Sequence, residues 1–256
     1  MQSNRLVTDL GENTVAVIDP EGWENRKNIL VILTHPDDPE FFCGATIARW
    51  TKMGHTVKYV LLTRGERGGN GRFVDPATLV KAREAEQKES AAVLGVNEIT
   101  YLNFPDGYLQ PSLEARKEVV RVIRKEAPHI VVTCDPTNVF HRKNRINHPD
   151  HLAAGQIVLE AVFPASGNSL FFPELIEEGL LPHTVEEIWF SITSNGNIFI
   201  DVTDTWEAKI LALHQHRSQI EDLDAFDLMM RKRHTEESSL DHPKYVESFH
   251  RIVFGK

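Results

Sequence analysis

Apolar runs alternate with amphipathic stretches along residues 28–160, and this alternation predicts the fold. The apolar run at 29–33 is short, unbroken and followed by Pro36, as expected for a buried strand of a parallel sheet. A helical pattern follows at 41–52, and Gly54 ends it. The same strand-then-helix pattern recurs, with strands at 56–62, 98–102 and 129–133 and helices at 76–94, 112–127 and 152–159. This order predicts an α/β fold, with a Rossmann-like, mostly parallel sheet and helices on both faces.

The pattern loosens after residue 163. Apolar segments at 187–192 and 197–201 flank Asn195-Gly196, a dipeptide typical of tight turns, so we expect a β-hairpin. A further helix is predicted at 205–216, whereas the loop at 137–147 and the segment at 220–256 have no clear pattern. We find no repeat and no low-complexity linker, and we predict a single domain over 1–256 with its core at about 28–219.

Two short segments of similar composition follow predicted strands. His35-Pro36-Asp37-Asp38 comes after the first strand, and His148-Pro149-Asp150-His151 opens the helix at 152–159. The carboxyl ends of parallel strands share one edge of a sheet, where open α/β sheets bind their ligands. Two histidines and one carboxylate drawn from these segments would form the three-ligand site of a catalytic zinc, with one position left for water.

Each of these residues also has a purely structural explanation. An aspartate at the start of a helix is more often a cap than a ligand, and twelve histidines in one chain make some clustering unsurprising. The two segments together, however, supply a complete ligand set at strand ends, and this favours a metal site. The remaining carboxylate and imidazole could then act as acid and base.

Composition excludes some classes of partner. With 28 Lys and Arg against 37 Asp and Glu, the formal net charge is −9, which argues against nucleic-acid binding. No apolar stretch approaches the ~20 residues of a membrane span. The two cysteines, Cys43 and Cys134, are too few for a disulfide framework, so we interpret them as small buried residues of a cytoplasmic protein.

The sequence resembles the LmbE-like (PIG-L) family of zinc-dependent de-N-acetylases, which act on N-acetylglucosamine-containing compounds. The likeness covers about residues 28–219. His35-Pro36-Asp37-Asp38 with Gly44-Ala45-Thr46-Ile47-Ala48 resembles its first motif, Thr63-Arg64-Gly65-Glu66 its second, His148-Pro149-Asp150-His151 its third, and residues 213–219 its late helix. The family has two glycines where this chain has Gly44-Ala45, and an acidic residue where it has Pro39.

The resemblance implies a zinc-dependent hydrolase that removes the N-acetyl group from a small amino-sugar substrate. It makes His35, Asp38 and His151 the zinc ligands and Asp37 the general base that takes a proton from the attacking water. It also implies an assembly of several copies, since family members often form homo-oligomers.

Three further residues receive roles from the same resemblance. A protonated His148 would stabilise the oxyanion, and Asp150 would orient a histidine without binding the metal. Arg64 would hold the sugar, although a salt bridge with Glu66 is an alternative. The glycine-rich loop from Gly65 to Gly71 matches no nucleotide-binding motif, and we interpret it as a wall of the substrate pocket.

Other functions stay open at this point. Two histidines and one carboxylate are also the facial triad of non-haem Fe(II) oxygenases, although those enzymes usually have an all-β barrel. An amidase that cuts a larger acyl group from an amino-sugar conjugate would need the same residues. A sugar- or metal-binding module without catalytic activity would need the ligands but would leave Asp37 without a role.

Overall fold

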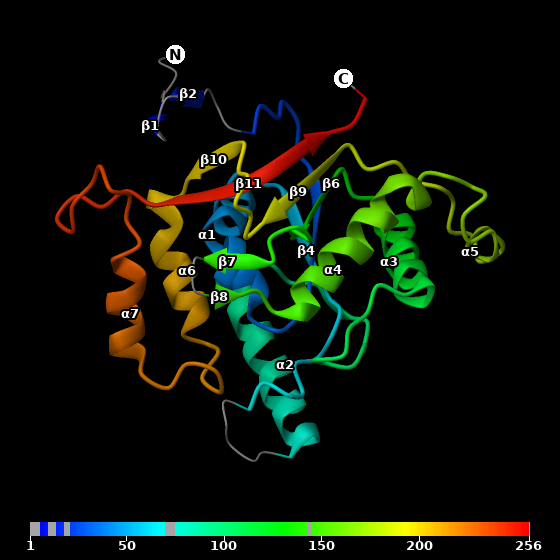
Figure 1. The fold of residues 1–256 in the computed structure, drawn as a ribbon, viewed down its shortest axis with the longest axis horizontal. Helices are drawn as coiled ribbons and strands as arrows, with labels where there is room; N and C mark the ends of the chain where they lie inside the picture. The colour runs from blue at the N-terminus through cyan, green and yellow to red at the C-terminus, as the bar shows by residue number, and fades with distance from the viewer. Residues whose placement is uncertain (1–5, 10–13, 18–20, 70–74, 143–144, 256) are drawn as a thin grey trace.

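The computed structural model describes residues 6–9, 14–17, 21–69, 75–142 and 145–255. A seven-stranded sheet crosses the middle of the molecule in the order β10-β11-β9-β6-β3-β4-β5 (Figure 1). Its strands are β3 (Asn28–Leu33), β4 (Thr56–Leu61), β5 (Ile99–Tyr101), β6 (Ile130–Cys134), β9 (Glu187–Ser191), β10 (Ile198–Asp201) and β11 (Val246–Val253). The neighbours from β9 to β5 are all parallel, as predicted, and only β11 runs antiparallel to its two neighbours.

Helices cover both faces of the sheet. Successive side chains of a strand point to opposite faces, so an apolar strand has side chains to bury on each face. Ile29, Val31 and Leu33 of β3 belong to a core shared with α1 (Asp38–Lys52), α2 (Pro76–Val93) and α6 (Trp206–Leu213). Leu30 and Ile32 belong to a second core with α3 (Leu113–Glu126) and α4 (Pro149–Glu160). The predicted α/β fold with helices on both faces is confirmed.

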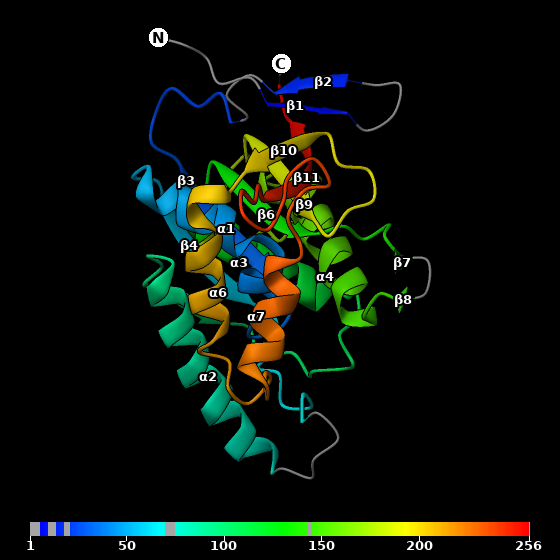
Figure 2. The ribbon, with the colours of Figure 1, turned by 90° about the vertical axis from the view of Figure 1, so that its left-hand side faces the viewer.

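Two helices begin within one residue of their predicted starts, each at a capping side chain. Asp75 accepts a hydrogen bond from the Thr78 N–H at 2.9 Å and Pro76 opens α2, while Ser112 accepts one from the Ala115 N–H at 3.1 Å at the start of α3. The long helix α2 extends well beyond the lower edge of the sheet in Figure 2. Its first turns therefore stand next to the loops that leave the strands.

The predicted hairpin at 187–201 is wrong. β9 and β10 are not paired with each other, because β11 lies between them and is antiparallel to both. Ile198 is opposite Phe249, and Phe190 is opposite His250. A turn dipeptide reports only on local chain direction, and it gives no sign that a strand from the end of the chain will insert between its flanking segments.

The segments without a clear pattern also acquire structure. Residues 220–256 contribute α7 (Leu223–Arg231) and β11, and the loop at 137–147 contains the antiparallel pair β7 (Phe140–Arg142) and β8 (Arg145–Ile146). The remaining elements are β1 (Leu6–Asp9), β2 (Thr14–Val17), a π-helix (Ala161–Ser166), α5 (Glu174–Glu177) and a 3₁₀ turn (Thr203–Thr205). One sheet joins strands from residue 28 to residue 253, while the assignment of 1–256 to a single domain stays a prediction.

Two predictions about the environment of the chain bear on the fold. Cys43 and Cys134 are free and buried, and burial raises the pKa of both thiols well above their usual value, in agreement with a packing role. Within the described ranges, no helix combines the length and the apolar character needed to cross a membrane.

Candidate metal-dependent active site

The two His-Pro-Asp segments meet at the carboxyl edge of the sheet, as the parallel topology predicted. β3 and β6 are neighbours, and the turns after them lead toward α1 and α4. His151 Nε2 lies 3.2 Å from Asp38 Oδ1 and 3.3 Å from His35 Nδ1, and the latter atom lies 3.3 Å from Asp38 Oδ2. Three potential ligand atoms therefore converge on one point.

This convergence fits a small metal ion. Ligand atoms that lie about 2.0–2.1 Å from a tetrahedral zinc are about 3.3 Å apart. This is close to the 3.2 and 3.3 Å that separate His151 Nε2 from Asp38 Oδ1 and His35 Nδ1. Asp38 is held in place because its Oδ2 accepts hydrogen bonds from the N–H groups of Thr34 and His35, at 3.2 and 2.8 Å. Its Oδ1 is left to face His151 and the metal position.

His35, His148 and Asp150 form a second, overlapping group of potential ligands. The Asp150 carboxylate, however, accepts the N–H groups of Gly107 at 2.7 Å and Leu109 at 3.3 Å, one on each oxygen. Asp150 is thus tied to the backbone, whereas Asp38 keeps one oxygen facing only histidine. Of the two groups, His35, Asp38 and His151 could hold a metal ion without the loss of a backbone hydrogen bond to Asp150.

The second ring nitrogen of His35 faces a carboxylate that the sequence did not single out. His35 Nε2 lies 3.1 Å from Asp106 Oδ1 and 3.5 Å from Asp150 Oδ2. Asp106 follows β5 in a polar turn, so its place at a strand end was the only signal available. Burial alone would lower the pKa of His35. The nearby carboxylates of Asp38, Asp106 and Asp150 outweigh this effect and hold that pKa well above its usual value. A carboxylate at Nε2 keeps the proton there and directs Nδ1 to a metal.

Asp37 stands beside the ligands in an unusual backbone conformation. Its φ of 97° is in the left-handed region that non-glycine residues seldom adopt. Two side chains of α2 hold it there: Gln87 accepts the Asp37 N–H at 2.7 Å, and Arg83 Nη2 donates to Pro36 O at 2.5 Å and to Asp37 Oδ2 at 3.2 Å. Burial raises the pKa of Asp37 to about 6, against the opposite effect of Arg83.

Arg83 depends in turn on a glycine of the loop after β4. Gly65 has a φ of +69°, and its carbonyl accepts a hydrogen bond from Arg83 Nη1 at 2.9 Å. A Cβ at Gly65 would lie 2.3 Å from the same Nη1, so any larger residue would displace the guanidinium. The described part of the predicted loop therefore supports the site, while Asn70 and Gly71 lie outside the described residues.

Gln87 links Asp37 to a buried polar chain behind the site. Its Nε2 donates to both oxygens of Glu40 at 3.0 and 3.1 Å, and His216 Nε2 lies 3.3 Å from Glu40 Oε2. Gln87, Glu40 and His216 are completely buried. His216 belongs to the segment that the sequence compared with a late helix, and the structure shows that it follows the end of α6.

With this geometry in view, the comparison with known families is decisive. The family described as GlcNAc-PI de-N-acetylase, PIG-L, matches residues 30–162, which is more than half of the chain and includes all eight residues of the two His-Pro-Asp segments. This chain belongs to the PIG-L family. The resemblance drawn from the motifs is thereby confirmed.

Individual PIG-L relatives and solved structures agree. A diacetylchitobiose deacetylase of Thermococcus kodakarensis is 39% identical over 199 residues, covering 78% of this chain and 72% of that protein. A probable N-acetyl-alpha-D-glucosaminyl L-malate deacetylase 2 of Bacillus cereus is 28% identical over 208 residues, covering 77% and 85%. The N,N'-diacetylchitobiose deacetylase of Pyrococcus horikoshii, solved with its inhibitor MPG, has a TM-score of 0.80 and 31% identity, covering 90% of this chain and 85% of that one.

His148 lies at the open side of the metal position. Its ring centroid is 4.9 Å from that of His35 and 5.2 Å from that of His151, and the side chain is exposed. Its Nδ1 accepts the N–H of Asp150 at 3.2 Å, which also caps α4. Burial of part of the ring, together with His35 and His151, lowers the pKa of His148. These surroundings therefore favour the neutral imidazole of His148 over the protonated form that the resemblance implied.

The resemblance implied that Asp150 orients a histidine, and the structure places Asp150 beside two histidines. Its carboxylate lies 3.5 Å from His35 Nε2, and its backbone N–H donates a hydrogen bond to His148 Nδ1. Asp150 therefore contacts both rings without occupying the metal position.

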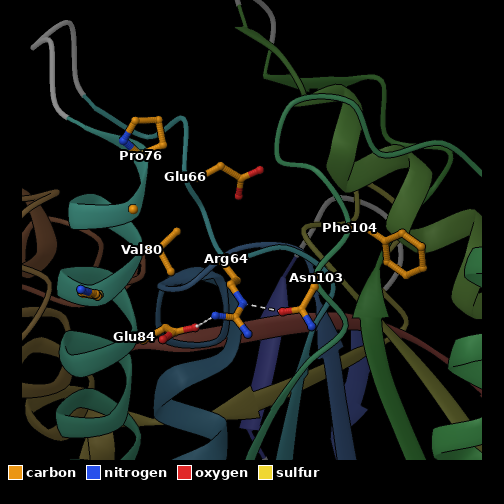
Figure 3. A pocket seen from close by; sticks show the side chains of 9 residues that line it. Arg64, Glu66, Pro76, Val80, Glu84, Asn103 and Phe104 are labelled. Carbon is orange, nitrogen blue, oxygen red and sulfur yellow. Dashed lines mark hydrogen bonds and ion pairs between the residues drawn. The ribbon is translucent and has the colours of Figure 1, made fainter.

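Arg64 lies in a neighbouring pocket instead of among the metal ligands (Figure 3). Its Nη1 is paired with Glu84 Oε1 of α2 at 2.8 Å, and its Nε donates to Asn103 Oδ1. The expected alternative partner, Glu66, lines the same pocket but does not hold the guanidinium. The arginine that contacts Asp37 is Arg83, which the sequence analysis did not identify because a buried arginine on a helix face has no local signature.

Proposed function

We propose that this protein is a metal-dependent hydrolase that removes the acetyl group from the nitrogen of an N-acetylglucosamine-containing substrate. The observation that carries the proposal is the convergence of His35, Asp38 and His151 with Asp37 beside them at the open edge of the sheet. Membership of the PIG-L family and likeness to proteins named as deacetylases of such substrates support it.

We infer that the metal is Zn²⁺, held by His35, Asp38 and His151. Two imidazoles and one carboxylate are a common ligand set of catalytic zinc. When bound there, the ion supplies the Lewis acidity that acidifies a water molecule and polarises an amide carbonyl. The carboxylates at His35 Nε2 would raise the basicity of that ligand and fix its orientation.

Asp37 moves the proton in this mechanism. Its carboxylate takes a proton from the water whose oxygen attacks the acetyl carbon, and a raised pKa suits a group that must both accept and release a proton near neutral pH. When the carbon–nitrogen bond breaks, Asp37 gives that proton to the departing amine. The products are acetate and a free amino sugar.

His148 stabilises the oxyanion as a neutral donor. Because Nδ1 accepts the Asp150 N–H, a neutral His148 carries its proton on Nε2. That Nε2–H is then available for a hydrogen bond to the oxygen on which negative charge develops. A protonated imidazole is not required for this role.

The alternative functions differ in what they would require. An Fe(II) oxygenase would use the same triad, but it has no need of a carboxylate next to the ligands in a braced, left-handed conformation. A binding module would have no use for Asp37 either. An amidase for a larger acyl group differs only in the acyl chain, and a panel of N-acyl glucosamines of increasing chain length would separate it from a deacetylase.

We also infer a cytoplasmic homo-oligomer that does not bind nucleic acid. The two buried, free cysteines support a cytoplasmic location. The net charge of −9 argues against binding to nucleic acid. Exposed apolar side chains such as Ile146 and Leu170, which are 79% and 85% exposed, are candidates for burial between copies. Light scattering of the purified protein measures the oligomeric state.

The test of the proposed function is acetate release. Zinc-loaded protein is incubated with N-acetylglucosamine conjugates, and free acetate and free amine are measured together. Equal amounts of both are expected for at least one conjugate, and release by the Asp37→Asn variant should be slower by about 10²–10⁴-fold. Release of neither product from any conjugate would overturn the proposal.

A further inference from the structure

We propose that the pocket around Arg64 binds an uncharged sugar ring joined to the amino sugar, so that the substrate is a short oligosaccharide and not the conjugate of an acid. The inference rests on the proposed function and adds to it the chemical class of the group beyond the N-acetylglucosamine. We name this pocket the Arg64 pocket; it is lined by Arg64, Glu66, Pro76, Ala77, Val80, Lys81, Glu84, Asn103 and Phe104.

Three segments form the walls of the Arg64 pocket. They are the loop after β4, the first turns of α2 and the loop after β5, and they enclose about 580 Å³. Figure 3 shows Arg64 between Glu84 and Asn103, with Val80 extending from α2 and Glu66 from the loop that also carries Arg64. The volume lies within the range of about 300–1,000 Å³ that is usual for small-molecule sites.

Two of these walls continue directly into the metal site. Glu66 Oε1 accepts the N–H of Asp106 at 2.8 Å, and Asp106 Oδ1 lies 3.1 Å from the metal ligand His35. On the side of α2, the residue before Glu84 is the buried Arg83, whose Nη2 donates a hydrogen bond to Asp37. The Arg64 pocket therefore lies next to the metal site. When the acetamide of a substrate is at the metal site, the group joined to the amino sugar can enter the Arg64 pocket.

The charges of the Arg64 pocket are already balanced. The Arg64 guanidinium is paired with Glu84 at 2.8 Å and also donates to Asn103. Glu66 places a second carboxylate in the lining, which balances the other lining cation, the exposed Lys81. A carboxylate or phosphate entering this space would have to compete with Glu84 for Arg64 and would face Glu66, so the lining selects against anions.

The remaining lining matches the surface of a sugar. Carboxylate and amide groups held in fixed positions can bind hydroxyl groups as donors or acceptors. Val80, Pro76, Ala77 and Phe104 provide apolar surface for the C–H faces of a ring.

The experiment compares a two-ring and a one-ring substrate. Val80→Trp fills the pocket from α2, and Ala77→Trp fills it from an exposed lining position where a packing defect is less of a risk. Ala85→Trp places the same side chain on an exposed position of the same helix that does not line the pocket. Steady-state kinetics are measured with N,N'-diacetylchitobiose and with N-acetylglucosamine, and the melting temperature confirms that each variant is folded.

For both pocket variants we expect the KM for the disaccharide to rise by about tenfold or more, because the second ring loses its site. The kcat/KM for the monosaccharide should stay within about twofold of the wild type, because only interactions with the second ring are removed. Ala85→Trp should change neither. Equal losses on the two substrates, or no loss on either, would overturn the pocket assignment.

Two further measurements separate this inference from the proposed function. Calorimetric binding of the disaccharide to wild-type protein, lost in Val80→Trp and kept in Ala85→Trp, would support the pocket even if no sugar released acetate. Absence of acetate release alone would contradict only the proposed function. A wild-type kcat/KM that is higher for N-acetylglucosaminyl malate than for the disaccharide would contradict the charge argument and thus the inference.

Discussion

Arg83 Nη2 donates a hydrogen bond to Asp37 Oδ2 at 3.2 Å, across 46 residues of sequence. The same nitrogen donates to Pro36 O, and the other terminal nitrogen donates to Gly65 O. The position of the carboxylate next to the metal ligands is therefore set by α2 and by the loop after β4, and not only by the turn that carries it. A substitution in that loop should therefore displace Arg83 and, with it, the carboxylate of Asp37.

Gly65→Ala tests this coupling. The new Cβ would lie 2.3 Å from Arg83 Nη1, so the guanidinium must move and Asp37 loses its brace. We expect kcat to fall by about 10²-fold, the usual cost of misplacing a catalytic group by about 1 Å, with metal content unchanged. Gly179→Ala is the matched control, because Gly179 has a φ of +85° and no atom near its Cβ position. Unchanged kcat in Gly65→Ala would show that Arg83 does not position Asp37.

Asp37→Asn removes the proton acceptor and keeps its shape. General acid–base catalysis contributes about 10²–10⁴-fold, and kcat should fall by that factor. Metal content, measured by atomic absorption, should stay near the wild-type value because the change replaces no ligand. Loss of metal in Asp37→Asn together with retention in Asp38→Asn would mean that the two aspartates have exchanged roles.

The same variant has a consequence for the pH profile. Asp37 must be ionised to accept a proton, so activity is present above its pKa and is lost as the pH falls through it. Burial raises the pKa of Asp37 to about 6, which places the loss on the acidic side of neutrality. The acidic limb of the kcat/KM profile should be absent from the residual activity of Asp37→Asn, and an unaltered limb would assign it to another group.

Asp106→Asn should weaken metal binding without removing a ligand. The carboxylate 3.1 Å from His35 Nε2 orients that ring, and loss of such a partner typically costs about 10–100-fold in metal affinity. Competition with a chromogenic chelator measures the affinity. Asp135→Asn is the control, since Asp135 is also buried near a strand end but accepts hydrogen bonds from Thr137 and Thr193. Equal affinities in the two variants would deny Asp106 this role.

A fourth change concerns stability. The helix α1 is interrupted at Cys43, whose φ and ψ are −146° and 20°, and the freed groups are bound by residues from the C-terminal part of the chain. Glu247 of β11 accepts the N–H groups of Ala45 and Thr46 at 3.3 and 2.8 Å, and Lys209 of α6 donates to Phe41 O at 2.9 Å and to Glu247 at 2.5 Å.

Lys209→Met should therefore be strongly destabilising. It leaves the buried Glu247 without its cation, and removing one partner of a buried pair typically costs about 3–5 kcal/mol. Denaturant unfolding followed by circular dichroism measures the change. Lys58→Met, which removes a cation from partly exposed pairs with Glu98 and Glu126, is the comparison and should cost about 1 kcal/mol or less. Similar losses in the two variants would contradict the stabilising role of the buried pair.

These contacts also show where sequence reasoning succeeds and where it stops. The meeting of Asp38 with His151 was predictable, because apolar runs identify parallel strands and parallel strands bring their carboxyl ends to one edge. The start of α2 at Asp75-Pro76 was predictable for a different reason, because the hydrogen-bond partner of Asp75 lies within one turn of the helix.

The elements that the sequence did not reveal are fixed by distant partners. β11 separates β9 from β10, and the hairpin prediction failed because no local pattern records that insertion. Arg83 and Asp106 reach the site through the orientation of a helix and a loop, which becomes known only once the whole sheet is assembled. The interruption of α1 at Cys43 likewise depends on Glu247, which lies at the other end of the chain.

We propose above all that a metal held by His35, Asp38 and His151 is required for acetate release. The direct measurement is a titration of chelator-treated protein with Zn²⁺ while acetate release from N,N'-diacetylchitobiose is followed. We predict no release from the metal-free protein, a linear rise that ends at one equivalent of metal per chain, and no recovery in Asp38→Ala. Acetate release by the metal-free protein at the rate of the loaded protein would contradict the account.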